Sequence, residues 1–520
     1  MTCGLFGGIL YLVENELFYF FHILRILKEG EICLNANREF ALNKYNKPTF
    51  CNLPTVAELR ESLRLSESVE AREQINALFD DNTFIEIGAY TKRGSSDFIT
   101  TEKNNEFEGV ICGYGAIDGK LVFAFIEDAS RMGGAIDERH AKKICDLYNM
   151  AISNGAPVIG VFNSNGTDIF EGTAGLAAYG RIMSAITRAS GVIPQIAYVG
   201  GNCIGTCAAI ASMFDIVVKN DEASLYVSSP ALTGEKDAQD AIVSFHGGSE
   251  QCISYIIGIV SLLPSNSSVG VQCVEIYTDN LNRKLGNLDF GGDALAVISV
   301  ISDNSMFFEL GRDYAPSATT ALTTIGGVRC GIVATSHSKN DGRIDVAGAR
   351  KIAKFVTFCD SFSIPVVTIV DSMGLAINKK NEQLFAPELA KLAMAYASST
   401  CPKITVIHGH AIGAAFVLLG SKSLGADLVY ATESSEIGAL SAASGVAFAW
   451  DKYITEEKTR EELISEWRTT VSSPVNAAAS GEIDDIITTN EMRARICSAL
   501  LMLCAKGDAS AVARRKVLPL

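Results

Sequence analysis

The chain repeats itself at a spacing of 208 residues, and this repeat limits its possible folds more than any other feature. When Gly134–Gly166 is compared with Gly342–Gly374 without gaps, eleven of 33 positions are identical. An internal match of this length predicts two copies of one domain. We place the copies at residues 51–285 and 286–520, after an extension of residues 1–50. The turn-forming run Leu263–Ser268 begins the junction between them.

Both copies show the same order of predicted elements. A helix precedes a proline and a short apolar run, which is typical of a buried strand. A longer helical stretch, a second strand, a turn of small residues and an Ala-rich helix follow. In the two copies the first helix is expected at Ile136–Asn154 and Ile344–Phe362, and the second strand at Gln195–Val199 and Lys403–Ile407. This strand–helix–strand order predicts an α/β fold with a mainly parallel, helix-covered sheet in each copy.

The two turns of small residues are candidate sites for stabilising an oxyanion. They span Gly201–Cys207 and Gly409–Ala415. A strand-to-helix turn aims backbone N–H groups outwards, and glycine or alanine lets another atom approach them. Fixed N–H dipoles stabilise a developing anion without a charged side chain. Tight packing of a helix against a strand requires the same residue types, so a purely structural role remains the alternative for each turn.

Several other patterns are missing from the sequence. It contains no G-x-S-x-G, no phosphate-binding G-x-x-x-x-G-K-[ST] and no complete G-x-G-x-x-G. The sequence contains neither C-x-x-C nor H-E-x-x-H, so we predict no metal site. We interpret His408 and His410 as structural. A net charge of -15 argues against nucleic-acid binding. The fourteen scattered cysteines predict reduced thiols in a cytoplasmic protein.

The first 50 residues contain one apolar stretch, Leu5–Leu27. Glu14, Glu16, His22 and Arg25 interrupt it, and charges are costly at bilayer depth. The first four residues also lack the positive charge with which a signal peptide begins. We therefore expect an extension of unknown role outside the fold, with a membrane anchor as the alternative.

Seven motifs then follow one another through both copies, over about residues 66–510. They are Gly113–Lys120 with Phe123–Phe125, Gly133–Gly134 with His140–Cys145, Gly155–Gly160, Ser190–Ile196, Ser261–Asn266, Cys401–Ile407 and Gly420–Asp427. In this order they resemble the biotin-dependent acyl-CoA carboxyltransferases, a family that includes propionyl-CoA carboxylase β subunits and the α subunits of sodium-pumping acyl-CoA decarboxylases.

The resemblance implies two crotonase-like (ClpP/crotonase) domains, the first binding an acyl-CoA and the second binding carboxybiotin. It also implies dimers that assemble into a hexamer, with each active site between the first domain of one subunit and the second domain of its partner. Carboxybiotin releases carbon dioxide, the biotin anion removes a proton from the acyl α-carbon, and the resulting enolate captures the carbon dioxide. A short acyl-CoA such as propionyl- or methylmalonyl-CoA is the implied substrate.

Matching the family's motifs residue by residue assigns roles in this chain. Gly205 and Thr206 are implied to stabilise the thioester enolate, and Ala414 and Ala415 to hold the biotin ureido oxygen. Residues implied to bind substrate are Gly133, Gly134, Asn165, Gly166 and Gly413.

The chain departs from the family's pattern at three places. Thr206 replaces the second glycine of a Gly-Gly pair, and Asp168 replaces an arginine. Asp371–Ala376 replaces a Pro-Gly-Phe segment.

The sequence has no A-M-K-M biotinylation motif, so biotin is expected on a separate carrier protein. A biotin carboxylase or a membrane decarboxylase subunit is the further partner that the family implies. The alternative hypothesis, prompted by Thr206 and Asp168, is a non-catalytic paralogue that assembles with an active subunit.

Overall fold

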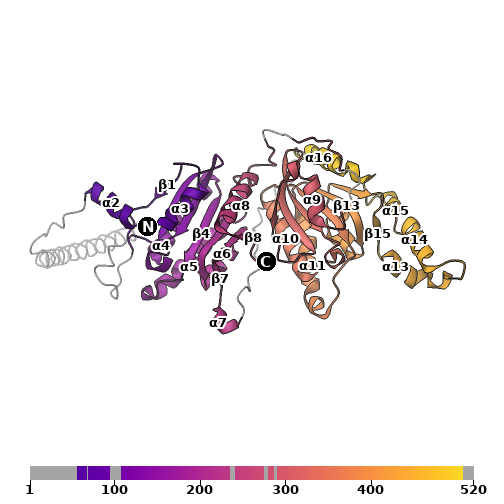
Figure 1. Ribbon diagram of the computed structural model, residues 1–520, viewed down its shortest axis with the longest axis horizontal. Helices are drawn as coiled ribbons and strands as arrows, with labels where there is room; N and C mark the ends of the chain where they lie inside the picture. The colour runs from indigo at the N-terminus through magenta and orange to yellow at the C-terminus, as the bar shows by residue number, and fades with distance from the viewer. Residues whose placement is uncertain are drawn as a thin grey trace, which may run out of the picture. The chain divides into compact units, whose positions relative to one another are not determined.

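The structure is a computed structural model that describes residues 55–66, 68–93, 107–234, 241–274, 279–285 and 290–506. The chain divides into two compact units, Met1–Leu65 and Ser66–Leu520, and both sheets belong to the second unit (Figure 1). Helix α2 (Val56–Ser66) precedes the first sheet in the chain. The extension expected at residues 1–50, including its apolar stretch, lies outside the described residues. In the part of the chain that is described, no helix combines the length and apolar character that crossing a membrane requires.

The first copy is built on an eight-stranded sheet with the order β1-β2-β3-β4-β5-β6-β8, in which β7 pairs with β5. Strands β1 to β3 are antiparallel, and the pairs from β3 to β8 are parallel. The strands are β1 (Ile85–Ile87), β2 (Val110–Ile117), β3 (Lys120–Glu127), β4 (Val158–Ser164), β5 (Gln195–Ile204), β6 (Ile216–Asn220), β7 (Ser224–Tyr226) and β8 (Phe245–Gly247). The helices are α3 (Val69–Leu78), α4 (Glu138–Asn154), α5 (Thr173–Ala189), α6 (Thr206–Ser212), α7 (Pro230–Thr233) and α8 (Ser249–Leu262).

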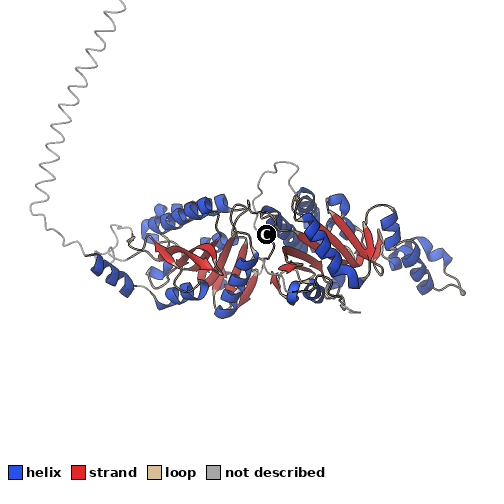
Figure 2. Cartoon of the chain, turned by 90° about the horizontal axis from the view of Figure 1, so that it is seen from above, coloured by secondary structure: helices blue, strands red, loops and turns tan. Residues whose placement is uncertain are grey.

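The second copy repeats this sheet in the order β16-β14-β13-β12-β11-β10-β9, with β15 paired to β13. Its strands are β9 (Phe307–Leu310), β10 (Ala318–Ile325), β11 (Val328–Thr335), β12 (Val366–Ser372), β13 (Lys403–Ile412), β14 (Leu428–Thr432), β15 (Glu436–Gly438) and β16 (Asp485–Ile487). Its helices are α9 (Ala294–Ile301), α10 (Val346–Ser361), α11 (Lys379–Ser398), α12 (Ala414–Leu418), α13 (Ala442–Gly445), α14 (Arg460–Thr470), α15 (Pro474–Ala479) and α16 (Met492–Leu503). Figure 2 shows helices flanking each sheet.

The spacing of 208 residues is preserved strand by strand. Strands β2 to β5 begin and end 208 residues before β10 to β13. Beyond the turns the spacing becomes 212, because β6 and β7 begin at 216 and 224 but β14 and β15 at 428 and 436. The second copy therefore contains four extra residues between its turn helix and the next strand. The predicted fold class, a duplicated α/β domain, is confirmed, whereas the proposed boundary near residue 285 stays a prediction.

The second strands are longer than the sequence indicates. They were expected to end at Val199 and Ile407, but β5 and β13 continue to Ile204 and Ile412. The additional residues pair with short strands that come later in the chain: Asn202 with Ser224 in β7, and His410 with Glu436 in β15. Most of each expected turn is thus strand, and the turn itself is reduced to one glycine.

A hydrophobic core connects the two copies. Helices α4 and α5 cover one face of the first sheet, while residues of α3 and α8 pack on the other face. The residues of α3 and α8 form one continuous cluster with apolar residues of β9, β10 and α10. At this contact a Cβ on Gly258 would lie 2.1 Å from the ring of Phe308, so the helix and the phenylalanine meet without a side chain between them. The far face of the second sheet has its own core, formed with α9 and α16.

A buried charged group supports the first sheet next to its loops. His140, near the start of α4, is fully buried, with Nδ1 3.5 Å from Glu108 and Nε2 3.8 Å from Glu127. Helix α4 begins there because Asp137 accepts the His140 amide at 2.7 Å. Burial opposes a charge on the imidazole, but the two carboxylates outweigh it and raise the pKa of His140 to about 9.

The raised pKa of His140 makes stability depend on pH in a defined window. The contribution is complete below the ordinary pKa of 6.5 and is lost as the pH rises through about 9, for a total on the order of 3 kcal/mol. We expect the thermal midpoint of the wild type to fall across this window more steeply than that of His140→Gln. Because burial also lowers the pKa values of Lys120 and Lys351 to about 8, the difference between the two proteins is the measurement. Parallel curves would contradict the prediction.

Candidate active site

The two strand-to-helix turns have the same backbone geometry. Gly205 lies between β5 and α6 with φ 64° and ψ −128°, and Gly413 lies between β13 and α12 with φ 58° and ψ −128°. Residues with a side chain rarely adopt this conformation. A Cβ on Gly205 would contact nothing within 4 Å, so glycine is required there by the backbone and not by crowding. The duplication has therefore preserved a strained turn in both copies.

The amide groups of each turn are arranged alike. The Gly205 N–H donates to the carbonyl of Tyr226 at 2.9 Å, and the Gly413 N–H donates to that of Gly438 at 2.8 Å. The next two amides, of Thr206 and Cys207 and of Ala414 and Ala415, donate to no acceptor among the described residues. They are the unpaired N–H groups with which a helix begins.

This geometry bears on one residue of the predicted site, whose role stays a prediction. Gly205 was expected to offer its N–H as an oxyanion donor, but that group is already bound to Tyr226. By the spacing of 208 residues, the counterparts of Ala414 and Ala415 are Thr206 and Cys207, while Gly205 corresponds to Gly413. Cys207 is thus a further candidate donor, which the family motifs did not indicate and which the internal repeat does.

The loops of the first copy assemble the other predicted residues around its turn. The amide of Asn165 donates to the carbonyl of Gly133 at 3.0 Å, and Ser164 Oγ donates to that of Gly134 at 2.7 Å. Asn202, three residues before the turn glycine, donates its side-chain amide to Asn165 Oδ1 at 2.7 Å. A Cβ on Gly134 would lie 2.3 Å from the carbonyl oxygen of Asn163, so the loops meet backbone to backbone. Gly133, Gly134, Asn165 and Gly166 therefore lie on adjoining loops next to Asn202, with Gly134 buried.

Asp168, the residue that departs from the family's arginine, has a buried partner. Arg93 donates to Asp168 Oδ2 at 2.7 Å and lies 3.8 Å from Asp137. The side chains of Arg93 and Asp168 are each only 3% exposed. The reversed charge at position 168 is thus balanced by an arginine from another part of the chain, and the pair holds the loop that follows β4. Asp168 does not by itself indicate a damaged site.

In the second copy three strand ends bring together ionisable side chains. His337 follows β11, Asp371 is in β12 and His410 is in β13. His410 Nδ1 lies 2.9 Å and His337 Nδ1 3.6 Å from Asp371 Oδ1, and the two rings stack with centroids 4.8 Å apart. Counterparts in the first copy are Ala129, Asn163 and Asn202. The interpretation of His410 as structural did not consider this contrast between the copies, which the repeat makes visible.

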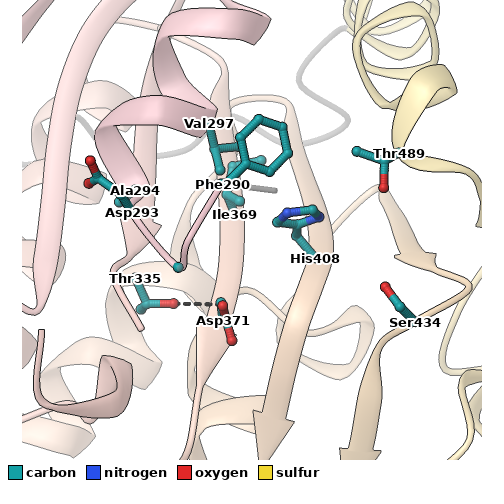
Figure 3. Close-up of a pocket in the computed structure, with 11 residues that line it drawn as sticks. Phe290, Asp293, Ala294, Val297, Thr335, Ile369, Asp371, His408, Ser434 and Thr489 are labelled. Atoms are coloured by element: carbon teal, nitrogen blue, oxygen red, sulfur yellow. Dashed lines mark hydrogen bonds between the residues drawn. The ribbon is translucent and has the colours of Figure 1, made fainter. Parts of the chain in front are cut away.

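A cavity of about 280 Å³ lies beside this group, on the α9 side of the sheet (Figure 3). His408 and Phe290 meet edge to face in it at 4.9 Å between ring centroids. Burial lowers the pKa of His408, so its imidazole is neutral near pH 7. The amide of Asp371 donates to Thr335 Oγ1 at 2.7 Å at the cavity wall.

Comparison with known proteins agrees with this architecture. The carboxyl transferase domain family matches residues 68–518. Methylmalonyl-CoA decarboxylase subunit alpha of Veillonella parvula is 32% identical over 470 residues, which cover 85% of this chain and 91% of that protein. The propionyl-CoA carboxylase beta chain of Saccharopolyspora erythraea is 30% identical over 485 residues, covering 85% and 89%. The crystal structure of the transcarboxylase 12S hexamer with methylmalonyl-CoA and methylmalonic acid bound aligns with a TM-score of 0.83 and 28% identity, over 91% of this chain and 100% of that one.

The fold and the matched turns define a duplicated crotonase-like enzyme. The chain belongs to the carboxyl transferase domain family, and it is a carboxyltransferase of the biotin-dependent carboxylase class. The resemblance predicted from the sequence motifs is thereby confirmed, as is the prediction that the chain is an enzyme.

The buried pair of Arg93 and Asp168 leads to a test of stability. Removing Asp168 leaves the buried Arg93 guanidinium with only the more distant Asp137, at 3.8 Å, and breaking a buried pair typically costs about 3–5 kcal/mol. We expect Asp168→Ala to lower the free energy of unfolding by about this amount, measured by urea denaturation. The double variant Arg93→Met with Asp168→Leu should lose clearly less, because the one carboxylate left without the arginine, Asp137, still accepts the His140 amide. Equal losses in the single and double variants would show that the pair is not the source of the effect.

Proposed function

We propose that the chain moves a carboxyl group between biotin and the α-carbon of a short acyl-CoA, most simply propionyl-CoA and methylmalonyl-CoA. The observation that supports it is the pair of matched turns, each with two consecutive amides that donate to no acceptor in the described chain. The reaction has two developing anions, a thioester enolate and a biotin ureido anion. A duplicated domain with one anion-stabilising turn in each copy suits such a reaction.

Each turn would act through its backbone. In the first copy the amides of Thr206 and Cys207 would donate to the thioester oxygen as the α-carbon loses its proton. In the second copy the amides of Ala414 and Ala415 would donate to the ureido oxygen as the bond between nitrogen and the carboxyl carbon breaks. The substrate surface would be formed by Gly133, Gly134, Asn165 and Gly166. Gly205 and Gly413 would set the turn geometry.

Biotin would arrive on a separate carrier protein, with no metal required. A biotin carboxylase or a membrane decarboxylase subunit would complete the assembly. The transcarboxylase 12S structure is described as a hexamer, which supports a homo-oligomer of the same type here, from dimer to hexamer, with sites shared between subunits. We propose a cytoplasmic location for the assembly.

The proposal is tested by incubating the purified protein with methylmalonyl-CoA or malonyl-CoA and free biotin. We expect biotin-dependent loss of carbon dioxide, followed as formation of the decarboxylated acyl-CoA. No turnover with either substrate, together with co-purification of a second carboxyltransferase subunit, would favour the non-catalytic paralogue instead.

The second turn gives the first activity prediction. In Ala414→Val both amides remain, but a β-branched side chain occupies the space that the flat ureido ring needs. We expect biotin-dependent decarboxylation to fall by about 100-fold or more, the scale for losing an oxyanion donor. Acyl-CoA affinity, measured by calorimetry, should change little.

Two controls accompany Ala414→Val. Ala479→Val places the same change at an exposed position of α15, and it should leave turnover unaltered. The thermal midpoint shows whether overpacking has destabilised the protein. Normal turnover in a folded Ala414→Val protein would contradict the assignment of biotin binding to the second copy. Lost acyl-CoA affinity would mean that the second copy binds the acyl-CoA and the first copy binds biotin.

The first turn gives the second activity prediction. Thr206 is exposed at the start of α6, and only its amide is needed in the proposed role. Thr206→Gly keeps the amide and removes the crowding methyl and hydroxyl groups. We expect transfer to be unchanged or faster, measured as kcat/KM for the acyl-CoA. A loss of more than about tenfold, or about 1.4 kcal/mol, would assign a positive role to the threonine side chain.

A further inference from the structure

One electrostatic difference between the two copies lies at the strand ends beside the turns. Asn202 and His410 occupy equivalent positions on β5 and β13, and each donates its backbone amide to the residue on the neighbouring strand. In the first copy that acceptor is Asn163 Oδ1 at 3.1 Å, and in the second it is Asp371 Oδ1 at 2.9 Å. The backbone arrangement is therefore the same, while an uncharged pair has been replaced by a histidine and a carboxylate.

Asp371 determines how the imidazole of His410 is presented. Nδ1 lies 2.9 Å from the carboxylate, so the ring donates there and Nε2 points away. Among the hydrogen bonds of the described residues the His410 ring takes part through Nδ1, and the side chain is 31% exposed. His337 stacks on the ring at an interplanar angle of 18°, which restricts its rotation.

The charge of His410 depends on the groups that face it. The hydrogen bond to Asp371 raises the pKa of His410, burial opposes it, Glu436 of β15 adds to the rise and Arg468 of α14 reduces it. Arg468 is itself paired with Glu436 at 3.1 Å, and His337 faces the same carboxylate of Asp371. These contacts favour the imidazolium form, in which Nδ1–H donates to Asp371 and Nε2–H is left to donate elsewhere.

The three side chains do not suit a metal ion, although their ligand atoms lie within 4.8 Å of one another. An imidazole binds a metal in the plane of its ring. The rings of His337 and His410 are nearly parallel and stacked, so one ion cannot lie in both planes at bonding distance. An anionic ligand, received by Nε2 alone, fits the arrangement better.

We propose that His410 is the group by which the second copy distinguishes carboxylated biotin from biotin itself, its Nε2–H donating to the carboxylate carried on the ureido nitrogen. This rests on the proposed function. His410 is three residues before Gly413, about 10 Å along an extended strand, so the imidazole and the turn amides belong to the same end of β13.

The proposed hydrogen bond from His410 affects the binding of carboxylated biotin more than the rate of carboxyl transfer. It stabilises the carboxylate before the bond to nitrogen breaks, and it is lost when neutral carbon dioxide leaves. Its removal should therefore weaken binding of the carboxylated form and leave kcat unchanged or raised. The carboxyl group itself is transferred without any covalent step on His410.

The test uses two stable probes, biotin and biotin carrying an acetate group on the ureido nitrogen, with affinities from saturation-transfer NMR. We expect the wild type to prefer the anionic probe by about tenfold or more, as for a hydrogen bond to a charged group. His410→Asn, which installs the residue of the first copy, should lose the preference. Asp371→Asn should keep the preference for the anionic probe at pH 6. As the pH is raised, this variant should lose the preference at a lower pH than the wild type does.

His408→Asn is the matched control, because it makes the same change two residues earlier on β13 and should keep the preference. An unaltered preference in His410→Asn, or none in the wild type, would overturn the inference. Binding of one zinc ion that His410→Asn abolishes would also overturn it and assign the group to a metal. A wild type that binds neither probe would instead contradict the proposed role of the second copy.

Discussion

One backbone hydrogen bond in each copy organises the proposed chemistry. The N–H of the turn glycine donates to a carbonyl of the short strand beside it, Tyr226 in the first copy and Gly438 in the second. That bond holds the glycine in its unusual conformation at the point where the strand ends. The next two amides are then the first of a helix and have no partner behind them. The extension of β5 and β13, the short strands β7 and β15 and the turn helices all depend on this contact.

The duplication also shows which parts of the site are tied to the fold and which vary with the ligand. Strands β2 to β5 and their counterparts agree residue for residue in length, and both turns share one geometry. The side chains around the turns differ: Asn163 and Asn202 in one copy, Asp371 and His410 in the other. The backbone of the sheet leaves little freedom at the turn, whereas side chains at the strand ends project beyond it. Selectivity can therefore change without disturbing the oxyanion amides.

Buried charges beneath the first site explain how the chain tolerates its departure from the family's pattern. Asp168 is paired with Arg93, and His140 is paired with Glu108 and Glu127. An arginine at position 168 would meet Arg93 at the same place, so the two positions are coupled. A sequence motif shows only one member of such a pair, because its partner lies 75 residues away in the chain.

The sequence alone determined the duplication, the α/β class, the two turns and the family, because these depend on spacing and on small residues that leave a visible pattern. Helix starts were close to prediction for the same reason, since Asp137 and Asp345 cap α4 and α10 locally. Only the tertiary structure decided which amides are left to donate. The partner of the Gly205 N–H is a carbonyl 21 residues later in the chain, brought to it by strand pairing. The grouping of His337, Asp371 and His410 likewise requires three adjacent strands, and no local pattern places residues so far apart in the sequence within hydrogen-bonding distance.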